Sequence, residues 1–471
     1  MDEQTALKGL ILRRFFSCFH SVDYHGASIG KYYYNQFLYH VLGQWDLTHA
    51  KENLPYWHEI NEMKDSDVYQ WIDEPYPYDP HPGGLILMRG GFGDIASLYL
   101  PKERFILLSP NQAEVDLIKL NRPDLTAHNI ENYYRENPTA VEALNQQIAA
   151  IIQNQKDDPL FGSTELLEWF KKQTPEIVRV FDAVQELFHN FHIGAVLTIS
   201  SIVWMDSALN LIARANRIPS LTLQHGLIFD RDLFCHTPIN ATKKMVWGNA
   251  NREWYQKYGF PESRTSVIGS PRFDTIFNRK WCGKEKLHQI LGIEPAQKIM
   301  VYATGTEMST IVPIILNGLA AIPDLFLILS LHPSETPIIS QYQQLTAGYF
   351  NCKVVRFGQI SLYDSLSGAD FFVTHCSTAA LEAMLFKLPV ITVEPSSSTC
   401  FSYGDLGASI RVSNSDELNQ VVSRLIGDAT YRANAVTQYQ KFLSHYCIPD
   451  GTASKRLFEQ VEHVCNTGGS A

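Results

Sequence analysis

A histidine follows directly after a run of apolar residues in LTLQHGLIFD, which covers residues 221–230. The run indicates a buried strand, and a chain that leaves a strand through Gln224-His225-Gly226 presents an imidazole at the edge of a sheet. The ordinary pKa of histidine is about 6.5, so His225 is suited to take a proton from a hydroxyl group near neutral pH. Asp230 is close enough in sequence to orient the ring or to act as the base itself. The alternative is that His225 is a structural residue that ends the strand.

Two hydroxyl side chains, Ser377 and Thr378, follow another apolar run in HCSTAALEAM, near the start of an expected helix. Free backbone N–H groups and the helix dipole make such a position suitable for a phosphate group. The alternative is that these hydroxyls only cap the helix. Glu382 lies about one turn into the helix, where it can accept a hydrogen bond from a ribose hydroxyl or be a solvated helix residue.

A histidine and an arginine follow other strands of the second half. Pro333 stops strand pairing after His332, whose imidazole can donate to a phosphate oxygen or, alternatively, cap a carbonyl. Arg272 in GSPRFD follows a tight turn, where it can neutralise a phosphate or form an ion pair with Asp274 or another acid. The same group of strand ends supplies small residues as further candidates for binding a phosphorylated donor: Ser270, Thr304, Gly305 and Thr306.

The segment RGGFGD, residues 89–94, predicts a glycine-rich turn after a strand of the first half. It does not match GxGxxG, and the sequence has no GxxxxGK[ST] motif. Glycine lets a backbone approach a ligand closely. Gly91, Gly93 and Asp94 are therefore candidates for the acceptor side of a site, together with the Gln224 and Gly226 already described.

The composition is that of a globular protein, with 45% hydrophobic and 19% charged residues in a chain of 471. The net charge of −10 and the lack of any long basic tract argue against a nucleic-acid partner. Eight scattered cysteines without a CxxC pair argue against a metal cluster or a disulfide scaffold. We expect no bound metal and no cofactor.

The N-terminal segment MDEQ is acidic and is not followed by a signal peptide, and no uninterrupted apolar run is long enough to span a membrane. LKGLILRRFFSCFH can form an amphipathic helix that rests on an anionic membrane surface, or a helix docked on the protein. We expect a cytoplasmic protein, with possible peripheral association at the inner face of the membrane. The sequence does not predict an oligomeric state.

Strands that alternate with helices predict an α/β fold with parallel sheets. The strands are near-continuous apolar runs, as in LFLILSLHP and PVITVEP, which is typical of sheets covered on both faces. We predict two Rossmann-like, doubly wound domains facing across a cleft, with a helical N-terminal extension. The predicted boundaries are 1–80 for the extension, 81–240 for the acceptor domain, 241–430 for the nucleotide-donor domain, and 431–471 for a C-terminal helix that packs back across the domains.

The pattern resembles the GT-B glycosyltransferases. It resembles more narrowly the bacterial surface-polysaccharide and teichoic-acid transferases, which include CDP-glycerol glycerophosphotransferases and CMP-Kdo or CMP-sialic acid transferases. Residues 195–460 carry the resemblance, in the segments LQHG, MVWG, GSPRFD, LHPSE, HCSTAALEAMLFKLPVIT and DGTASKR.

The resemblance implies that His225 is the base that deprotonates the acceptor hydroxyl. It also implies that His332-Pro333 and Ser377-Thr378 bind the phosphate of a cytidine nucleotide. The chain lacks the acidic-acidic-Gly base motif of the sialyltransferases. The expected activity is metal-independent transfer of a sugar from a nucleotide-sugar donor, with CMP favoured, to a hydroxyl of a glycan or lipid-linked acceptor in capsule or cell-envelope polysaccharide synthesis.

Three alternatives remain open at this point. A CDP-polyol phosphotransferase of the teichoic-acid type would use the same residues. A UDP-sugar 2-epimerase shares the layout, although its Ser-Gly-Gly loop is not evident. A non-catalytic glycan-binding or scaffold protein would keep the fold without needing these residues.

Overall fold

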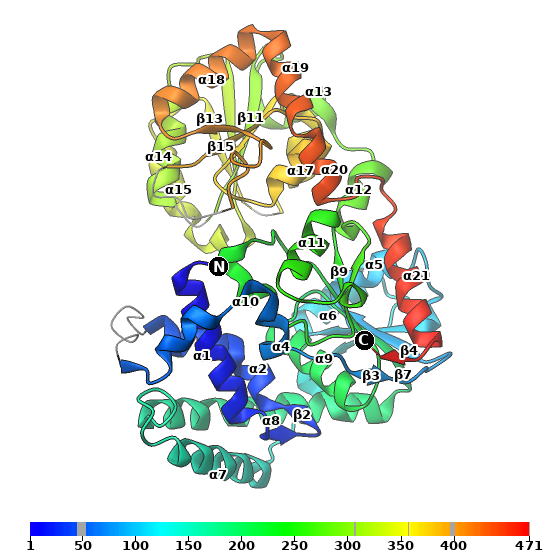
Figure 1. Ribbon diagram of the computed structural model, residues 1–471. Helices are drawn as coiled ribbons and strands as arrows, with labels where there is room; N and C mark the ends of the chain where they lie inside the picture. The colour runs from blue at the N-terminus through cyan, green and yellow to red at the C-terminus, as the bar shows by residue number, and fades with distance from the viewer. Residues whose placement is uncertain (45–52, 306–307, 357, 396–400, 471) are drawn as a thin grey trace. The chain divides into compact units, whose positions relative to one another are not determined.

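The computed structural model describes residues 1–44, 53–305, 308–356, 358–395 and 401–470. The chain forms two compact units, one of Met1–Ile268 with Ser454–Ala471 and one of Gly269–Ala453. Each unit is built on its own parallel sheet (Figure 1). Each unit is described by itself below.

The sheet of the first unit has, within the described residues, seven strands in the order β10-β9-β8-β7-β4-β5-β6. All neighbouring strands are parallel. The chain reverses its direction of travel across the sheet between β4 and β7, which makes this pair the topological switch point. The strands are β4 (Leu85–Arg89), β5 (Phe105–Ser109), β6 (Ala127–Asn129), β7 (Ile193–Thr198), β8 (Ser220–Leu223), β9 (Lys243–Val246) and β10 (Thr265–Val267).

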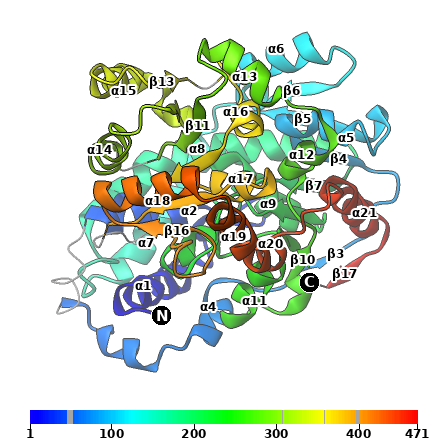
Figure 2. The ribbon, with the colours of Figure 1, turned by 90° about the horizontal axis from the view of Figure 1, so that it is seen from above.

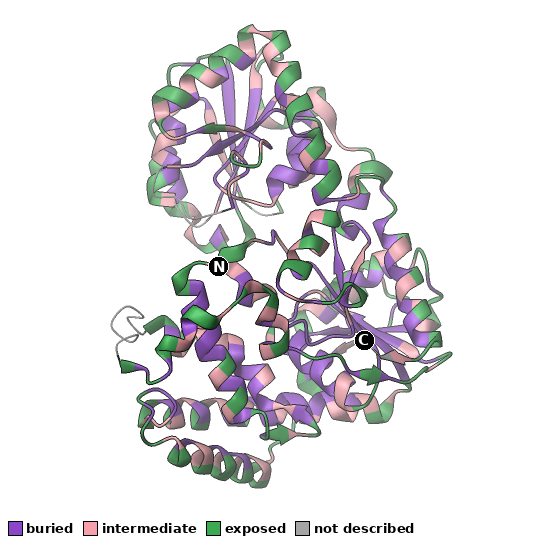
Figure 3. Cartoon of the chain, in the orientation of Figure 1, coloured by how far each residue is buried: buried purple, intermediate pink, exposed green. Residues whose placement is uncertain are grey.

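Helices cover both faces of this sheet, which explains why its strands are apolar throughout (Figure 3). One hydrophobic core joins one face to α1, α2, α7, α8 and α9, and the opposite face packs on α5 and α21. Figures 1 and 2 both show α21 beside β4 and β7. The helices are α1 (Glu3–Phe19), α2 (Ile29–Gln36), α4 (Val68–Ile72), α5 (Gly93–Ala96), α6 (Gln112–Asn121), α7 (Pro138–Asn154), α8 (Thr164–Asn190), α9 (Trp204–Ala215), α10 (Leu233–His236), α11 (Asn249–Lys257) and α21 (Ala453–Asn466).

The helix α1 is docked on the protein. Its apolar side chains Leu10, Ile11, Phe15 and Phe19 are buried in the core, so the docked alternative describes this segment and these side chains are not presented to a membrane. Across the described ranges, every helix is too short or too polar to cross a membrane.

The sheet of the second unit has, among the residues described, six parallel strands in the order β13-β12-β11-β14-β15-β16. Its switch point lies between β11 and β14. The strands are β11 (Lys298–Ala303), β12 (Leu325–Ser330), β13 (Cys352–Val355), β14 (Phe371–Thr374), β15 (Val390–Val393) and β16 (Ile410–Val412).

One core of the second unit joins its sheet to α14, α15 and α18. The opposite side of the strands faces α16 and α17, which contact β11 and β14. The helices are α12 (Asp274–Asn278), α13 (Gly283–Leu291), α14 (Met308–Leu319), α15 (Ile339–Thr346), α16 (Leu362–Gly368), α17 (Ala379–Leu385), α18 (Ser415–Gly427), α19 (Ala429–Gln438) and α20 (Gln440–Tyr446).

The boundary between the units follows β10, at Ile268, whereas we predicted it near residue 240. The two short strands β9 and β10 extend the first sheet instead of opening the second. The predicted extension, residues 1–80, belongs to the first unit, and so does α21 beyond Ala453, while α19 and α20 belong to the second.

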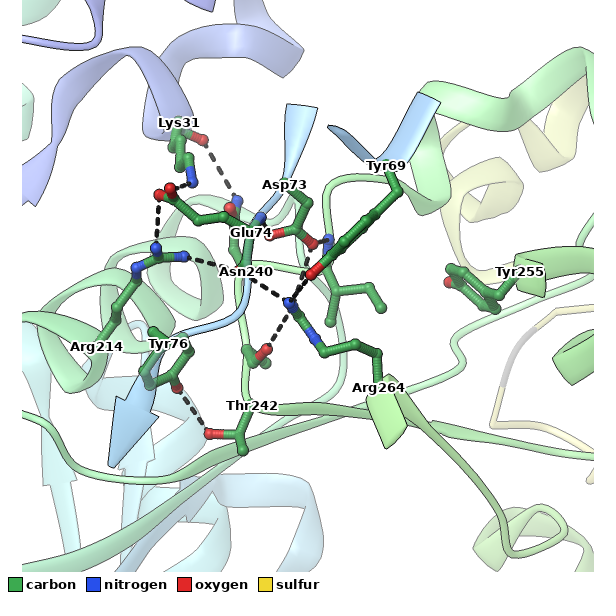
Figure 4. Close-up of polar contacts among 12 residues, drawn as sticks. Lys31, Tyr69, Asp73, Glu74, Tyr76, Arg214, Asn240, Thr242, Tyr255 and Arg264 are labelled. Carbon is green, nitrogen blue, oxygen red and sulfur yellow. Dashed lines mark hydrogen bonds and ion pairs between the residues drawn. The ribbon is translucent and has the colours of Figure 1, made fainter. Parts of the chain in front are cut away.

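A buried ion pair joins the extension to the first sheet (Figure 4). Arg264, just before β10, is 0% exposed and donates to Asp73 at 3.2 Å, to the Glu74 carbonyl at 2.8 Å and to the Ala241 carbonyl at 2.9 Å. Asp73 also accepts a hydrogen bond from the Ile239 amide at 2.9 Å. This network fixes the segment that leads from α4 into the sheet.

A second set of hydrogen bonds continues the same attachment. The Tyr76 hydroxyl contacts Ser220 of β8 at 2.9 Å and accepts from Thr242 at 2.8 Å. Glu74 accepts from Lys31 of α2 at 3.0 Å and from Arg214 of α9 at 2.6 Å (Figure 4). The extension is thus tied to the strands and to two helices of the same unit.

We expect Arg264→Met to lower the free energy of unfolding by about 3–5 kcal/mol, because Asp73 is then left buried without its cation. Urea unfolding followed by tryptophan fluorescence measures the change. The matched control is Lys171→Met, whose partner Glu168 is 62% exposed, so that about 0–1 kcal/mol is expected. Equal effects of the two substitutions would contradict a structural role for the buried pair.

Candidate functional site

Three of the predicted segments lie at one edge of the second sheet. Thr304-Gly305 follows β11, His332 comes soon after β12, and Ser377-Thr378 comes soon after β14. The strand order makes β12, β11 and β14 neighbours, and Ala303 is in register with both Ser330 and Thr374. Because ligands of open parallel sheets bind at carboxyl ends next to the switch point, this edge is the candidate functional site of the unit.

The Glu335 carboxylate holds two of these strand ends together. It accepts hydrogen bonds from the Thr304 hydroxyl and, at 2.7 Å, from the Tyr342 hydroxyl, and it caps the His332 amide. The Thr304 hydroxyl also accepts from the His332 amide at 3.0 Å. Thr304 is 3% exposed, so its hydroxyl is buried and links the ends of β11 and β12.

The His332 imidazole lies at the surface, above the hydrogen bonds of Glu335 and Thr304. It is exposed, and its Nδ1 lies 2.7 Å from the Ser334 hydroxyl. It also accepts from the Ser334 amide, so that His332 and Glu335 form a reciprocal cap on the turn that begins at Pro333. This arrangement fixes one ring nitrogen and leaves Nε2 pointing away from the cap.

The two hydroxyls of the Ser377-Thr378 pair differ. The Ser377 hydroxyl accepts from the Ala379 amide at 3.2 Å, which is the bond expected if this hydroxyl only caps the helix. The Thr378 hydroxyl makes no hydrogen bond to any residue in the described ranges, and the side chain is partly exposed. Thr378 is therefore the member of the pair whose hydroxyl is available to a ligand.

Arg272 and Glu382, predicted separately, form an ion pair. The Arg272 Nε lies 3.1 Å from the Glu382 Oε1, which also accepts from the Tyr363 hydroxyl at 2.8 Å. Glu382 is 5% exposed, so it is not a solvated helix residue, and the pairing partner of Arg272 is Glu382 instead of Asp274. Burial and the neighbouring carboxylate raise the pKa of Tyr363, which keeps its proton for this hydrogen bond.

The remaining donor-side candidates are backbone positions. Ser270 is 3% exposed and its carbonyl accepts from the Phe273 amide at 2.9 Å, which shapes the turn that carries Arg272. A side chain at Gly305 would meet no atom of the described residues within 4 Å. Thr306 lies outside the described residues.

In the first unit, His225 follows β8 and is exposed, as the sequence pattern predicted. Gln224 before it is buried and bonds to the Trp247 amide at 2.9 Å, to the Asn251 side chain at 3.1 Å and to the Gly226 carbonyl at 2.9 Å. Gln224 therefore fixes the turn that presents His225.

Asp230 contacts the helix α11. It accepts from the Trp254 indole at 2.8 Å and from Lys257 at 2.6 Å. Although partial burial raises the pKa of Asp230, its hydrogen bonds to Lys257, Tyr258 and Trp254 outweigh that effect and hold the pKa below the usual value. A carboxylate held in this way is a weaker base than an unpaired one.

The RGGFGD turn divides into packed and open positions. A side chain at Gly93 would come within 2.8 Å of Leu107, whereas one at Gly91 would meet no other atom within 4 Å. The Asp94 side chain is exposed and pairs with Arg122 at 3.0 Å. Gly91 is the position where a ligand can approach the backbone.

The sequence analysis did not single out a buried group of charges in the first unit. Asp206, at the start of α9, is 0% exposed and accepts from Arg89 at 3.0 Å and from the Ile199 amide at 3.2 Å. Burial raises the pKa of Asp206 even though Arg89 beside it favours the charged form. Lys244, the second residue of β9, is 3% exposed, and a lysine between the apolar run and Lys243 was the only signal that the sequence offered for it.

A search for three or more His, Cys, Asp or Glu side chains placed to hold a metal ion, limited to the residues with described positions, finds none. The expectation of metal-free chemistry stays a prediction.

No protein-family model matches the chain, and no curated protein matches it in sequence. Solved structures match it in fold. UDP-GlcNAc 2-epimerase from Neisseria meningitidis, bound to UDP-GlcNAc, has a TM-score of 0.53 and 13% identity over 80% of this chain and 98% of that one. S. aureus MnaA with UDP has a TM-score of 0.53 and 13% identity over 81% and 97%. A glycosyltransferase from Rickettsia africae has a TM-score of 0.48 and 14% identity over 83% and 100%.

These likenesses concern the fold. The chain has two Rossmann-like units on parallel sheets, as in the GT-B fold, and the predicted fold class is confirmed. The narrower resemblance to CMP- and CDP-dependent transferases stays a prediction.

We expect Glu335→Ala to lower the free energy of unfolding by about 1–3 kcal/mol, because the buried hydroxyls of Thr304 and Tyr342 lose their acceptor. Thermal unfolding measures it. The control is Glu417→Ala, which removes an exposed carboxylate that caps Ser413 and leaves no buried group unpaired. A loss for Glu335→Ala no larger than the control would show that the edge does not depend on this carboxylate.

Proposed function

We propose that the protein is a nucleotide-sugar enzyme of the glycosyltransferase type, which moves a sugar from a nucleotide-activated donor to a hydroxyl of a glycan acceptor. The observation that carries the proposal is the convergence of Gly305, His332 and Thr378 at the switch-point edge of the second sheet. An imidazole, an unbonded hydroxyl and an open glycine turn are together suited to a phosphate group.

The Arg272–Glu382 ion pair is a second argument for a nucleotide-binding site in this unit. Glu382 uses Oε1 for both Arg272 and Tyr363, and its Oε2 makes no hydrogen bond within the described part of the chain, which leaves it for a ribose hydroxyl. Arg272 is half exposed and binds Glu382 through Nε, which leaves its terminal nitrogens for a ligand phosphate in this proposal. The charge that develops on the leaving phosphate is stabilised by donors that are already in place.

The nucleotide is proposed to be a pyrimidine nucleotide. The resemblance of the motifs favours CMP, and two of the fold relatives with TM-scores above 0.5, the Neisseria and S. aureus proteins, are described with UDP-GlcNAc and UDP. His225 is the proposed general base for the acceptor hydroxyl, and no metal or cofactor takes part in the proposed reaction.

A second candidate is a UDP-sugar 2-epimerase, which the Neisseria relative favours by its name. An epimerase converts UDP-GlcNAc without any acceptor, whereas a transferase consumes its donor when an acceptor is present. Proton NMR of UDP-GlcNAc incubated with the protein alone distinguishes the two, because only the epimerase produces a new anomeric signal.

We expect CMP, CDP or UDP at millimolar concentration to raise the temperature of unfolding by a few degrees, since a ligand at 100 times its Kd stabilises by about 2.7 kcal/mol. Thr378→Val should weaken this shift without changing the stability of the free protein, because the hydroxyl makes no internal bond. Thr430→Val, on the exposed face of α19, is the control. No shift with any nucleotide would refute the proposal and favour a scaffold protein.

We expect His225→Ala to leave the nucleotide shift intact and to slow release of nucleotide from the donor about 10²–10⁴-fold, the usual contribution of a general base. His463→Ala, an exposed histidine of α21, is the control and should keep full activity. Unchanged release in the His225 variant would remove this residue from the mechanism.

A further inference from the structure

Polar side chains form a row across one face of the first sheet. Thr198 of β7, Thr222 of β8 and Lys244 of β9 are in register with one another, and Arg89 of β4 continues the row next to Thr198. The same face packs on α9 at β7 and β8, and Lys244 of β9 lies next to Thr222 at one end of the row.

Several groups at this place are buried without a hydrogen-bond partner. Lys244 is 3% exposed and makes no hydrogen bond or ion pair with any residue of the described ranges. The Thr222 hydroxyl, the Arg89 Nε and the hydroxyls of Ser201 and Ser207 are also buried and unpaired. Roughly nine in ten buried polar groups in native proteins have a partner, so a cluster of exceptions in one place calls for an explanation, and a polar ligand is one that fits all of these groups.

The surroundings of the cluster favour a negative ligand. Lys244 and Arg89 are cationic, and Asp206 is the one acidic side chain that the contacts place between them, already bonded to Arg89. The first turn of α9 adds the positive end of a twelve-residue helix, and its N-cap, Val203, supplies no side-chain acceptor. The position is also the switch point between β4 and β7.

We propose that Lys244, Thr222 and the first turn of α9 form a second binding site, which takes an oxyanion group carried by a sugar. The assignment of this sugar to the acceptor rests on the proposed function, whereas the binding itself does not. The acceptor of the proposed transfer is then an acidic glycan, with the anionic group on either a phosphate or a uronate.

Protonation is linked to binding at this site. Burial lowers the pKa of Lys244 to about 7, partly opposed by Asp206, and burial together with Lys244 and His225 lowers the pKa of His236 on α10 to about 3. His236 is therefore neutral at pH 6–9, and Lys244 is the buried cation at this site whose charge changes near pH 7. An anion favours the charged ammonium, so binding above pH 7 takes up a proton, and affinity falls about tenfold per pH unit there.

The test uses the full chain with glucose 6-phosphate, glucuronate and glucose, followed by thermal unfolding at pH 6 and 8 and by calorimetry in two buffers of different ionisation enthalpy. We expect one or both anionic sugars to bind and glucose not to bind, with uptake of about one proton at pH 8 and little at pH 6. Which of the two anions binds identifies the source of the oxyanion.

Lys244→Met, a substitution of similar volume, should weaken anion binding at least tenfold and abolish the proton uptake. Lys243→Met is the matched control, because this neighbouring lysine points to the opposite face of the same strand and should change neither quantity. Thr222→Val is a second, isosteric variant that should weaken binding without removing the proton uptake.

Anion binding that survives Lys244→Met, or the lack of any binding to the native protein, overturns the proposal. The nucleotide-induced shift is measured on the same samples and is assigned to the other unit, so Lys244→Met should keep it. A protein that binds nucleotide but no anionic sugar refutes only the second site, and one that binds the sugar but no nucleotide refutes only the proposed function.

Discussion

The guanidinium of Arg264 is buried completely, and the first unit is organised around the acceptors that surround it. An ion pair in such a place offsets its desolvation only when the remaining donors are also bonded. Arg264 meets this condition at its two terminal nitrogens, which bond to Asp73, the Tyr69 hydroxyl and two backbone carbonyls, while its Nε makes no hydrogen bond within the described residues (Figure 4). Since these acceptors come from residues 69–74 and from Ala241, the pair fixes the extension and the entry to β9 together.

The position of β9 determines where Lys244 and His225 lie in the first unit. β9 lies between β8 and β10, and its register with β8 brings Lys244 beside Thr222. The Gln224 amide then bonds to Trp247, just beyond β9, and fixes the turn that exposes His225. The extension is thus not an appendage, because its contacts hold the strands from which the predicted base and the buried lysine emerge.

The α/β fold and the location of the candidate site in the second unit were predictable, because the carboxyl ends of parallel strands lie at the same edge of a sheet. Small and hydroxyl residues after β11, β12 and β14 identified that edge without knowledge of the strand order. The support beneath it was not predicted, although Glu335, three residues after His332, had the spacing of a capping box. The pairing of Arg272 with Glu382 depends on a contact across 110 positions, which local patterns do not contain.

Other features lay beyond sequence patterns for physical reasons. β6 and β16 are edge strands of three residues, too short to show a period. β10 is equally short, so the prediction placed the boundary near residue 240, before β9 and β10, whereas the first unit ends after β10 at Ile268. Lys244 is the second of two lysines that begin the short strand β9, and the sequence alone does not show which of the two is buried. Its burial became visible only in the folded structure, where Lys244 is 3% exposed.

The contrast between Arg264 and Lys244 bears on how the second site is understood. Both are buried cations of the first unit, and Lys244 is in register with Thr265, the residue after Arg264. The fold gives the two terminal nitrogens of Arg264 four acceptors, so it can stabilise a buried charge at this part of the sheet. The Lys244 amine has no acceptor within the described residues. Burial lowers its pKa to about 7, so the amine can be neutral in the free protein. A lysine kept in that state, beside an unbonded threonine and a helix start without a side-chain cap, is arranged to acquire its charge together with an anion.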